Sequence, residues 1–142
     1  MVGIGSKSIT QRTATVSGRI SVPEATYNLA VSHGSPTTAG GGYEMPQEAE
    51  EKLRKKGGVI AVPQLDGMLA CKRTVELIPL CHQPSITRID VSLASEVKSD
   101  GITTVSCTGK TGVELEVLTA VSVALLNVWD MVKAVGGKEM EI

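Results

Sequence analysis

The sequence has almost no aromatic side chains. Its 142 residues include one Trp, two Tyr and no Phe, so aromatics make up 2% although apolar residues reach 42%. The core must therefore consist of Val, Ile, Leu, Ala and Met. Such side chains bury less area per residue than aromatic rings, which favours additional burial at a subunit interface. A chain of this length is expected to form one domain over residues 1–142.

The sequence also lacks an excess of charge of one sign and a long hydrophobic run. A formal net charge of −1 provides no broad field to attract nucleic acid or an anionic membrane. The longest uncharged apolar run, residues 117–129, is shorter than the ~20 residues that a membrane span needs. No basic and apolar leader opens the chain. We expect a soluble, cytoplasmic protein with neither nucleic acid nor membrane as a partner.

Cysteine is scarce and irregularly spaced. The three cysteines are Cys71, Cys81 and Cys107. An odd number without regular spacing argues against a disulfide framework and for a reducing compartment. Although His82 follows Cys81 directly, neither C-x₂-C nor H-x₃-H spacing is present, so no metal site is predicted.

Apolar periodicity predicts a mixture of strands and helices. The predicted strands cover residues 12–20, 59–62, 89–94 and 102–108, with Asp100-Gly101 as a hairpin turn. The predicted helices cover residues 22–34, 46–57, 67–78 and about 118–135, and residues 35–45 form a flexible loop or insertion. The order of these elements predicts an α+β fold of ferredoxin-like type, an antiparallel sheet with helices packed on one face.

The last predicted helix is apolar on nearly every face and is interrupted by Asn127, Asp130 and Lys133. A helix that is apolar all round is buried on all sides. Because a chain this short can hardly enclose such a helix, we expect it to pack between its own sheet and a second subunit. Asp130 and Lys133 share one face, and a buried charge pair there indicates a functional site. The alternative is an ion pair that only fixes the packing register.

Basic side chains stand at several element ends. They are Arg12, Lys56, Lys72, Arg73, Lys110 and Lys133. A single lysine at a helix end is ordinarily a solvated partner of the helix dipole. Lys72 and Arg73 differ because they lie inside a mostly apolar helix, although Arg73 could simply pair with Glu76.

His82 lies between two prolines, Pro79 and Pro84, which restrict the backbone around it. An imidazole held in one orientation suits a general acid or base. The alternative is a core histidine that bonds to a backbone group.

Two acids, Glu114 and Glu116, precede the last predicted helix. If the helix begins only after Glu116, both carboxylates line one side of a strand end, whereas on a helix they point about 200° apart. Glu116 and Asp130 are 14 residues apart, hence ~21 Å apart if both lie on one helix. They could not then touch one substrate from the same chain, so a site that uses both is shared between subunits.

Four segments together resemble the cyclic pyranopterin monophosphate synthase family, the molybdenum cofactor biosynthesis protein C family. They are Lys56-Gly57 and residues 71–82, 111–120 and 129–135, and the match runs in order over about residues 6–135. The family usually has Asp where this chain has Gly3 and Gly58. Its members also continue past the last helix with a strand and a Lys/Gly-rich tail, which we expect to be absent from this chain.

The resemblance implies a ferredoxin-like fold in a hexamer of three dimers, with each active site at a dimer interface. The implied reaction converts (8S)-3′,8-cyclo-7,8-dihydroguanosine 5′-triphosphate to cyclic pyranopterin monophosphate and releases diphosphate, downstream of a radical enzyme. No cofactor is required by the resemblance, and Mg²⁺ is compatible with the triphosphate. The expected compartment is the cytoplasm, or the mitochondrial matrix if the chain is excised from a eukaryotic protein.

The resemblance also implies roles for individual residues. The catalytic set is Asp130, Lys133, Lys56 and His82, and the substrate-binding set is Leu80, Cys81, His82, Leu115, Glu116, Glu114, Lys72, Arg12 and Lys110. Closely placed Lys and Arg suit a triphosphate of about four negative charges and its leaving diphosphate. We expect Lys133, Asp130 and His82 to share the proton transfers, and Glu114 and Glu116 to bind the guanine edge or tune the lysines.

Two other classes of function remain compatible with these residues. A non-catalytic oligomeric nucleotide-binding module would bind guanine nucleotides without releasing diphosphate. A purely structural oligomer would show no shift of melting temperature with ligand.

Overall fold

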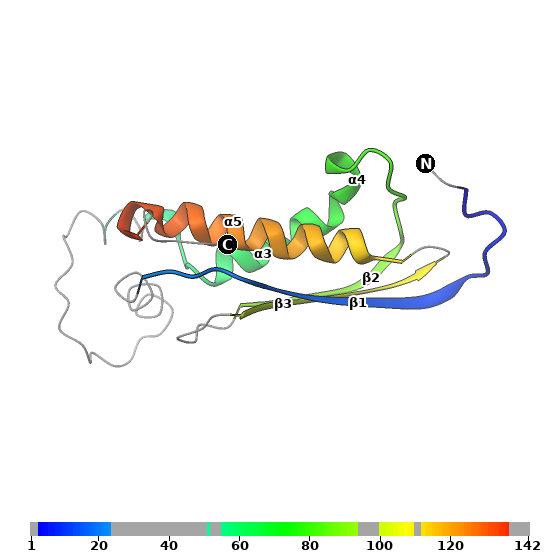
Figure 1. Cartoon of the computed structure of the whole chain (residues 1–142), viewed down its shortest axis with the longest axis horizontal. Helices are drawn as coiled ribbons and strands as arrows, with labels where there is room; N and C mark the ends of the chain where they lie inside the picture. The colour runs from blue at the N-terminus through cyan, green and yellow to red at the C-terminus, as the bar shows by residue number, and fades with distance from the viewer. Residues whose placement is uncertain (1–2, 24–50, 52–54, 94–99, 110–111, 137–142) are drawn as a thin grey trace.

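The computed structural model describes residues 3–23, 51, 55–93, 100–109 and 112–136. Figure 1 shows two helices lying along one face of a sheet. The strands are β1 (Thr10–Arg19), β2 (Ile86–Leu93) and β3 (Asp100–Gly109), and the helices are α3 (Ala61–Lys72), α4 (Thr74–Leu77) and α5 (Glu114–Gly136). The protein is a mixed α+β structure.

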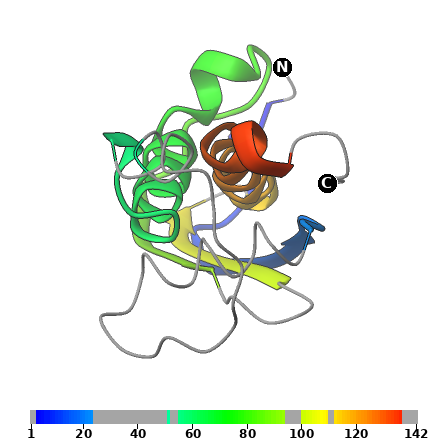
Figure 2. The same ribbon diagram turned by 90° about the vertical axis from the view of Figure 1, so that its left-hand side faces the viewer.

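The sheet is antiparallel with the strand order β1-β3-β2. Central β3 pairs with β1 from Thr10 opposite Gly109 to Arg19 opposite Asp100, and with β2 from Ile86 to Leu93. Helix α3 connects β1 to β2 across β3, and it lies beside α5 on the same face of the sheet (Figure 2). The predicted antiparallel sheet with helices on one face is confirmed.

The described core is aliphatic, as the composition requires. Alternate residues of β1, Ala14 and Val16, face the helices, where α5 contributes a row of fully buried small side chains. That row is Val117, Ala120 and Ala124, and Val113, just before the helix, is equally buried. On α3, a Cβ at Gly67 would lie 3.0 Å from the carbonyl oxygen of Ala120 and 3.2 Å from the Cβ of Ala124. Glycine therefore allows α3 and α5 to approach closely.

The predicted strand over residues 59–62 is wrong, because α3 begins at Ala61. Pro63 occupies the first turn of the helix, where its missing N–H would have no helical partner in any case. The N–H of Val62 donates to the carbonyl of Gly58 at 3.0 Å. Val59 is buried against Met131 and Val132 of α5, so its apolar character reflects core packing outside a strand.

The predicted helix over residues 67–78 is really two helices. Helix α3 starts six residues earlier, at Ala61, and the helical geometry breaks at Arg73, which has φ −110° and ψ 14°. The hydroxyl of Thr74 donates to the carbonyls of Ala70 at 3.3 Å and Cys71 at 3.0 Å. A threonine side chain that bonds these carbonyls competes with the helical backbone, which accounts for the break.

Asp100-Gly101 is not the hairpin turn. Both residues lie in β3, where Asp100 pairs with Arg19, and Gly101 pairs with Gly18 and Leu93. The predicted hairpin of β2 and β3 exists, and its connection falls in residues 94–99, outside the described residues. Pairing on both sides of β3 outweighs the local turn preference of the dipeptide.

Helix α5 begins at Glu114, earlier than predicted, and only one of its faces is buried in the chain. On the opposite face Leu118 and Leu126 are 47% and 56% exposed, with exposed Ser122 between them. By length and composition residues 114–133 could span a membrane, but they pack on the sheet and on α3 as a core helix does. The open face agrees with the expectation that a single chain does not enclose this helix, and its packing against a second subunit stays a prediction.

The first part of the chain is described only in places. The predicted helix at 22–34 and the loop at 35–45 lie outside the described residues, apart from residues 22 and 23, which are not helical. Of the predicted helix at 46–57, residues 51 and 55–57 are described; residues 51, 55 and 56 are helical, and residue 57 is not. Lys55 pairs with Glu51 at 2.8 Å, four residues apart, which fits that helix.

Candidate active site

Three of the four predicted catalytic residues meet at the C-terminal part of α5. Lys56 Nζ lies 2.8 Å from Asp130 Oδ2 and 2.5 Å from the Asp130 carbonyl oxygen. Lys133 Nζ lies 2.5 Å from the other carboxylate oxygen, Oδ1. We call Lys56, Asp130 and Lys133 the lysine cluster. Lys56 and Asp130 are 74 positions apart in the chain, and the fold brings them into contact.

Local backbone structure positions Lys56 at this cluster. Lys56 is the last residue of a helical segment, and Gly57 follows it with φ 91°. That left-handed conformation is typical of a glycine C-cap, which confirms the predicted role of Gly57. The chain then turns directly into α3, so Lys56 is held next to the end of α5.

The lysine cluster is exposed, which corrects the expectation of a buried Asp130–Lys133 pair. The Asp130 side chain is 56% exposed. Its hydrogen bond from Lys133, followed by the one from Lys56, lowers the pKa of Asp130 to about 2. The carboxylate is therefore ionised near neutral pH and holds two ammonium groups in place. It suits a positioning role better than that of a proton donor.

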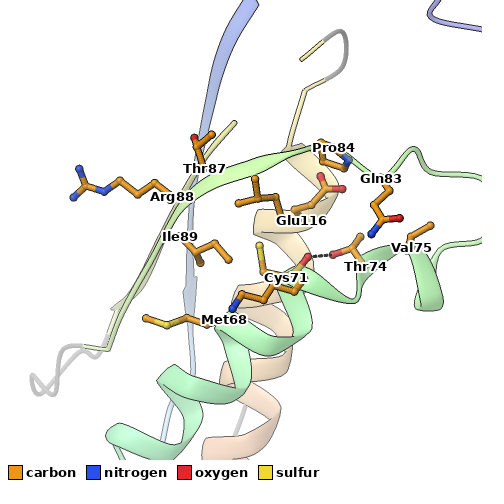
Figure 3. A pocket seen from close by; sticks show the side chains of 12 residues that line it. Met68, Cys71, Thr74, Val75, Gln83, Pro84, Thr87, Arg88, Ile89 and Glu116 are labelled. Atoms are coloured by element: carbon orange, nitrogen blue, oxygen red, sulfur yellow. Dashed lines mark hydrogen bonds between the residues drawn. The ribbon is translucent and has the colours of Figure 1, made fainter. Parts of the chain in front are cut away.

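A second group of predicted residues lines a cavity at the opposite end of α5. The cavity has a volume of about 530 Å³ and lies between the end of α3, the start of β2 and the first turn of α5 (Figure 3). It is lined by Met68, Cys71, Lys72, Thr74, Val75, Gln83, Pro84, Ile86, Thr87, Arg88, Ile89 and Glu116. Lys72 and Glu116 are the predicted site residues in this set.

Glu116 is a buried acid in the first turn of α5. It is 4% exposed, and this burial raises the pKa of its carboxyl group. Glu114 lies in the same turn, where helical geometry directs it elsewhere: it is exposed, and its carboxylate lies against Gly112. The arrangement in which both acids line one side of a strand end is therefore excluded.

The cysteines near the cavity are neutral thiols. Cys71 and Cys81 are both buried and free. Burial, followed by the charge of Glu116, raises the pKa of Cys71 to about 11, and the same two causes raise the pKa of Cys81. A protonated thiol is a poor metal ligand and a poor nucleophile. Within the described ranges, no group of three His, Cys, Asp or Glu side chains is suited to a metal ion.

The remaining predicted residues belong to neither group. Leu80 is exposed and His82 is half-buried in the loop between α4 and β2, and Leu115 is exposed on α5. Arg12 lies in β1, and its Nε is buried without a hydrogen-bond partner. Lys110 lies outside the described residues.

The structure separates the lysine cluster from the cavity. Glu116 and Asp130 both lie on α5, so the predicted ~21 Å between them applies. Figure 1 shows the two ends of this helix far apart. Sequence reasoning missed Gln83, Thr74 and the apolar walls of the cavity, because three separate elements form it and no local spacing identifies them.

Comparison with known proteins identifies a family for the whole chain. The model described as the MoaC family matches residues 1–142. A probable cyclic pyranopterin monophosphate synthase accessory protein of Methanothermobacter thermautotrophicus is 44% identical over 138 residues, which cover 95% of this chain and 74% of that protein.

Two further relatives are named cyclic pyranopterin monophosphate synthase. That of Chloroflexus aggregans is 41% identical over 145 residues, covering 100% of this chain and 76% of the relative. The synthase of Parvibaculum lavamentivorans is 41% identical over 138 residues, covering 95% of this chain and 74% of the relative. A family match over the whole chain and identities of this size agree, and the chain therefore belongs to the MoaC family.

Proposed function

We propose that this chain is a cyclic pyranopterin monophosphate synthase of molybdenum cofactor biosynthesis, the activity for which its Chloroflexus and Parvibaculum relatives are named. The substrate is (8S)-3′,8-cyclo-7,8-dihydroguanosine 5′-triphosphate, supplied by an upstream radical enzyme. The products are cyclic pyranopterin monophosphate and diphosphate. The lysine cluster is the observation that carries the proposal, because it presents two ammonium groups at one point of the surface.

The lysine cluster serves the phosphate end of the substrate. Lysines are mobile point charges, which suits a phosphate group that moves as the cyclic phosphate closes. The same charges stabilise the diphosphate as it leaves. Asp130 keeps Lys56 and Lys133 close together before the substrate arrives, which reduces the repulsion between them. No resident cofactor is needed for this chemistry, and any Mg²⁺ would arrive with the triphosphate.

The cavity serves the ring end of the substrate. Its walls are apolar, and Glu116 and Lys72 supply charged groups at its surface. His82, whose loop leads into β2, is our candidate for proton transfer together with Lys133. In this scheme Leu80, Cys81, Leu115 and Glu114 contact the substrate, and Arg12 and Lys110 add positive charge.

A single chain cannot present both ends of this site to one substrate, so we propose that the dimer is the site-forming unit. Two α5 helices packed antiparallel about a two-fold axis at Ser122 would place Leu118 against Leu126 of the partner subunit. The same axis would bring Glu114 level with Asp130 of the partner subunit. Exposed leucines on either side of a small residue suit such an isologous contact. Three dimers would form a hexamer.

The remaining finer expectations are proposals as well. The strand order β1-β3-β2, with α3 crossing over and a β2-β3 hairpin, matches a ferredoxin-like arrangement. We propose that the chain has this ferredoxin-like fold and forms one domain. We also propose that it acts in the cytoplasm.

Product analysis tests the function. Purified chain is incubated with the cyclic nucleotide, and pterin and diphosphate are measured for Lys56→Ala, Lys133→Ala and Lys55→Ala. Lys55 is an exposed neighbour that pairs with Glu51, so its variant is the matched control. The first two variants should lose at least ~10²-fold in turnover, as expected when transition-state charge is uncompensated, and the control should not. Near-normal turnover of both Lys56→Ala and Lys133→Ala would refute the proposal.

A second candidate function follows from the name of the Methanothermobacter relative, an accessory protein. A non-catalytic nucleotide-binding subunit would bind guanine nucleotides through the same cavity but release no diphosphate. The product assay on the unmodified chain separates the two functions.

A further inference from the structure

We propose that Gln83 is a specificity-determining residue that, together with Glu116, recognises the lactam edge of the guanine-derived ring in the cavity. The inference rests on the proposed function, since it assumes that a ring of this kind is the ligand. It adds a residue that the resemblance to the family does not assign.

The cavity has the shape and lining of a site for a flat heterocycle. Its volume of about 530 Å³ lies in the range of small-molecule sites, which combine apolar walls with few polar groups. Met68 and Cys71 of α3 lie on one side of the cavity and Ile89 of β2 lies on the other (Figure 3). Ile86, at the start of β2, also lines the cavity. The Cys71 thiol is neutral, so it adds to the apolar wall.

Two polar side chains at the cavity, Arg88 and Thr74, are already engaged. Arg88 Nε lies 2.6 Å from Asp90 Oδ2, and Figure 3 shows the guanidinium directed away from the cavity. The Thr74 hydroxyl donates to two carbonyls of α3. Glu116, by contrast, is joined to no cation by any salt bridge in the part of the chain that the structure describes.

Gln83 and Glu116 come from adjoining parts of the cavity wall. Gln83 lies in the loop just before β2, next to Pro84, and Glu116 lies in the first turn of α5. Figure 3 shows both side chains at this end of the cavity. A ligand ring between the two walls would present one edge to this pair, and exposed Lys72 also lines the cavity.

The two side chains match the hydrogen-bonding pattern of a guanine-type edge. That edge carries two donors, N1–H and the 2-amino group, followed by a carbonyl oxygen. The carboxylate of Glu116 can accept from both donors, and the carboxamide of Gln83 can donate to the carbonyl. Burial removes water contacts from the charged carboxylate of Glu116, so ligand donors that replace those contacts contribute strongly to the binding free energy. A 6-amino ring cannot accept from the Gln83 amide nitrogen at this position, and its unprotonated N1 offers no donor to Glu116, so it is discriminated against.

Triphosphates that differ only in the base edge test this assignment. Calorimetry on the full chain compares GTP with ITP, which lacks the 2-amino group. It also compares GTP with 2,6-diaminopurine riboside triphosphate, which replaces the carbonyl by an amino group and the N1–H donor by an acceptor nitrogen. Gln83→Ala should reduce the preference for GTP over the diaminopurine compound by about 3- to 10-fold, the effect of one neutral hydrogen bond. Its preference for GTP over ITP should stay unchanged.

Two further variants sharpen the test. Gln83→Glu replaces the donor by an acceptor, so it should reduce the preference for GTP over the diaminopurine compound more than Gln83→Ala does. Glu116→Gln should instead reduce the preference for GTP over ITP by about 10-fold or more, as expected for a charge-assisted bond. Gln11→Ala, on the exposed face of β1, is the matched glutamine control and should change neither preference.

Unchanged preferences in both Gln83 variants would overturn the inference, and so would an equal loss of affinity for all three triphosphates. Pterin formation by the unmodified chain together with either of these results refutes the role of Gln83 alone. Base preference that depends on Gln83, without diphosphate release from the cyclic nucleotide, supports the inference and refutes the proposed function.

Discussion

Replacing Gly67 by Ala should loosen the contact between α3 and α5 on which the cavity depends. The added methyl would meet the carbonyl oxygen of Ala120 at 3.0 Å, the Cβ of Ala124 at 3.2 Å and a Val91 methyl at 3.3 Å. Two of these atoms belong to helix backbone or to a Cβ, which cannot rotate away. The helices must therefore separate by a few tenths of an ångström.

The magnitude follows from two opposed effects. Overpacking of a well-packed core costs about 1–3 kcal/mol, whereas Ala in place of Gly gains about 1 kcal/mol of helix propensity. Because all three contacts come from buried neighbours, we expect the packing cost to dominate and stability to fall by about 1 kcal/mol. For a chain of this size that corresponds to a decrease in Tm of roughly 3 °C.

Thermal and urea unfolding at equal protein concentration measure this effect, with Gly58→Ala as the matched control. A Cβ at Gly58 would lie at ordinary distances from Ala61, 3.6 Å from its Cβ and 3.9 Å from its nitrogen, so that variant should stay within about 0.5 kcal/mol of the parent. If Gly67→Ala were as stable as the parent or more stable, the described approach of α3 to α5 would be refuted.

Three more predictions concern charge and assembly. Glu116→Gln should flatten the pH dependence of the free energy of unfolding. The pKa of Glu116 is raised in the folded protein, so the parent loses stability as pH rises from the ordinary carboxyl pKa through the raised value. Urea titrations of parent and variant across that pH window measure the difference. Asp130→Asn should lower turnover by about 10²-fold because the two lysines lose their common anchor, while Asp90→Asn, which removes another exposed pair, should not; equal turnover of both would contradict the positioning role. Leu126→Glu should dissociate the proposed dimer in sedimentation and Thr119→Glu, whose hydroxyl bonds within α5, should do so less; an unchanged size for Leu126→Glu places the interface elsewhere.

Elements whose sequence pattern reflects their own burial could be predicted, and those decided by distant partners could not. The alternation of Ala14 and Val16 in β1 reports directly which side faces the helices. Val59 is equally apolar, but its partners, Met131 and Val132, are over 70 residues away, so its pattern cannot distinguish a strand from a buried turn. Asp100-Gly101 has a strong local turn preference, which pairing with β1 and β2 overrides.

The same distinction applies to the candidate site. Asp130 and Lys133 are three residues apart, so helical geometry alone predicts their contact. The contact of Lys56 with Asp130 has no local signal, and only the resemblance to a known family placed both in one catalytic set. The role of Gln83 depends on a cavity formed by three elements, which becomes visible only in three dimensions.

The central position of β3 sets the order in which this sheet can form during synthesis. β1 pairs with β3 and with no other described strand, so the pairing of Thr10 with Gly109 can form only after Gly109 has left the ribosome. At roughly 5–20 residues per second, that delay is about 5–20 s. For this time the first strand exposes unpaired backbone groups on both edges, and its Thr- and Ser-rich sequence limits the risk of aggregation. A nascent chain stopped before β3 would contain none of the strand pairing seen among the described residues.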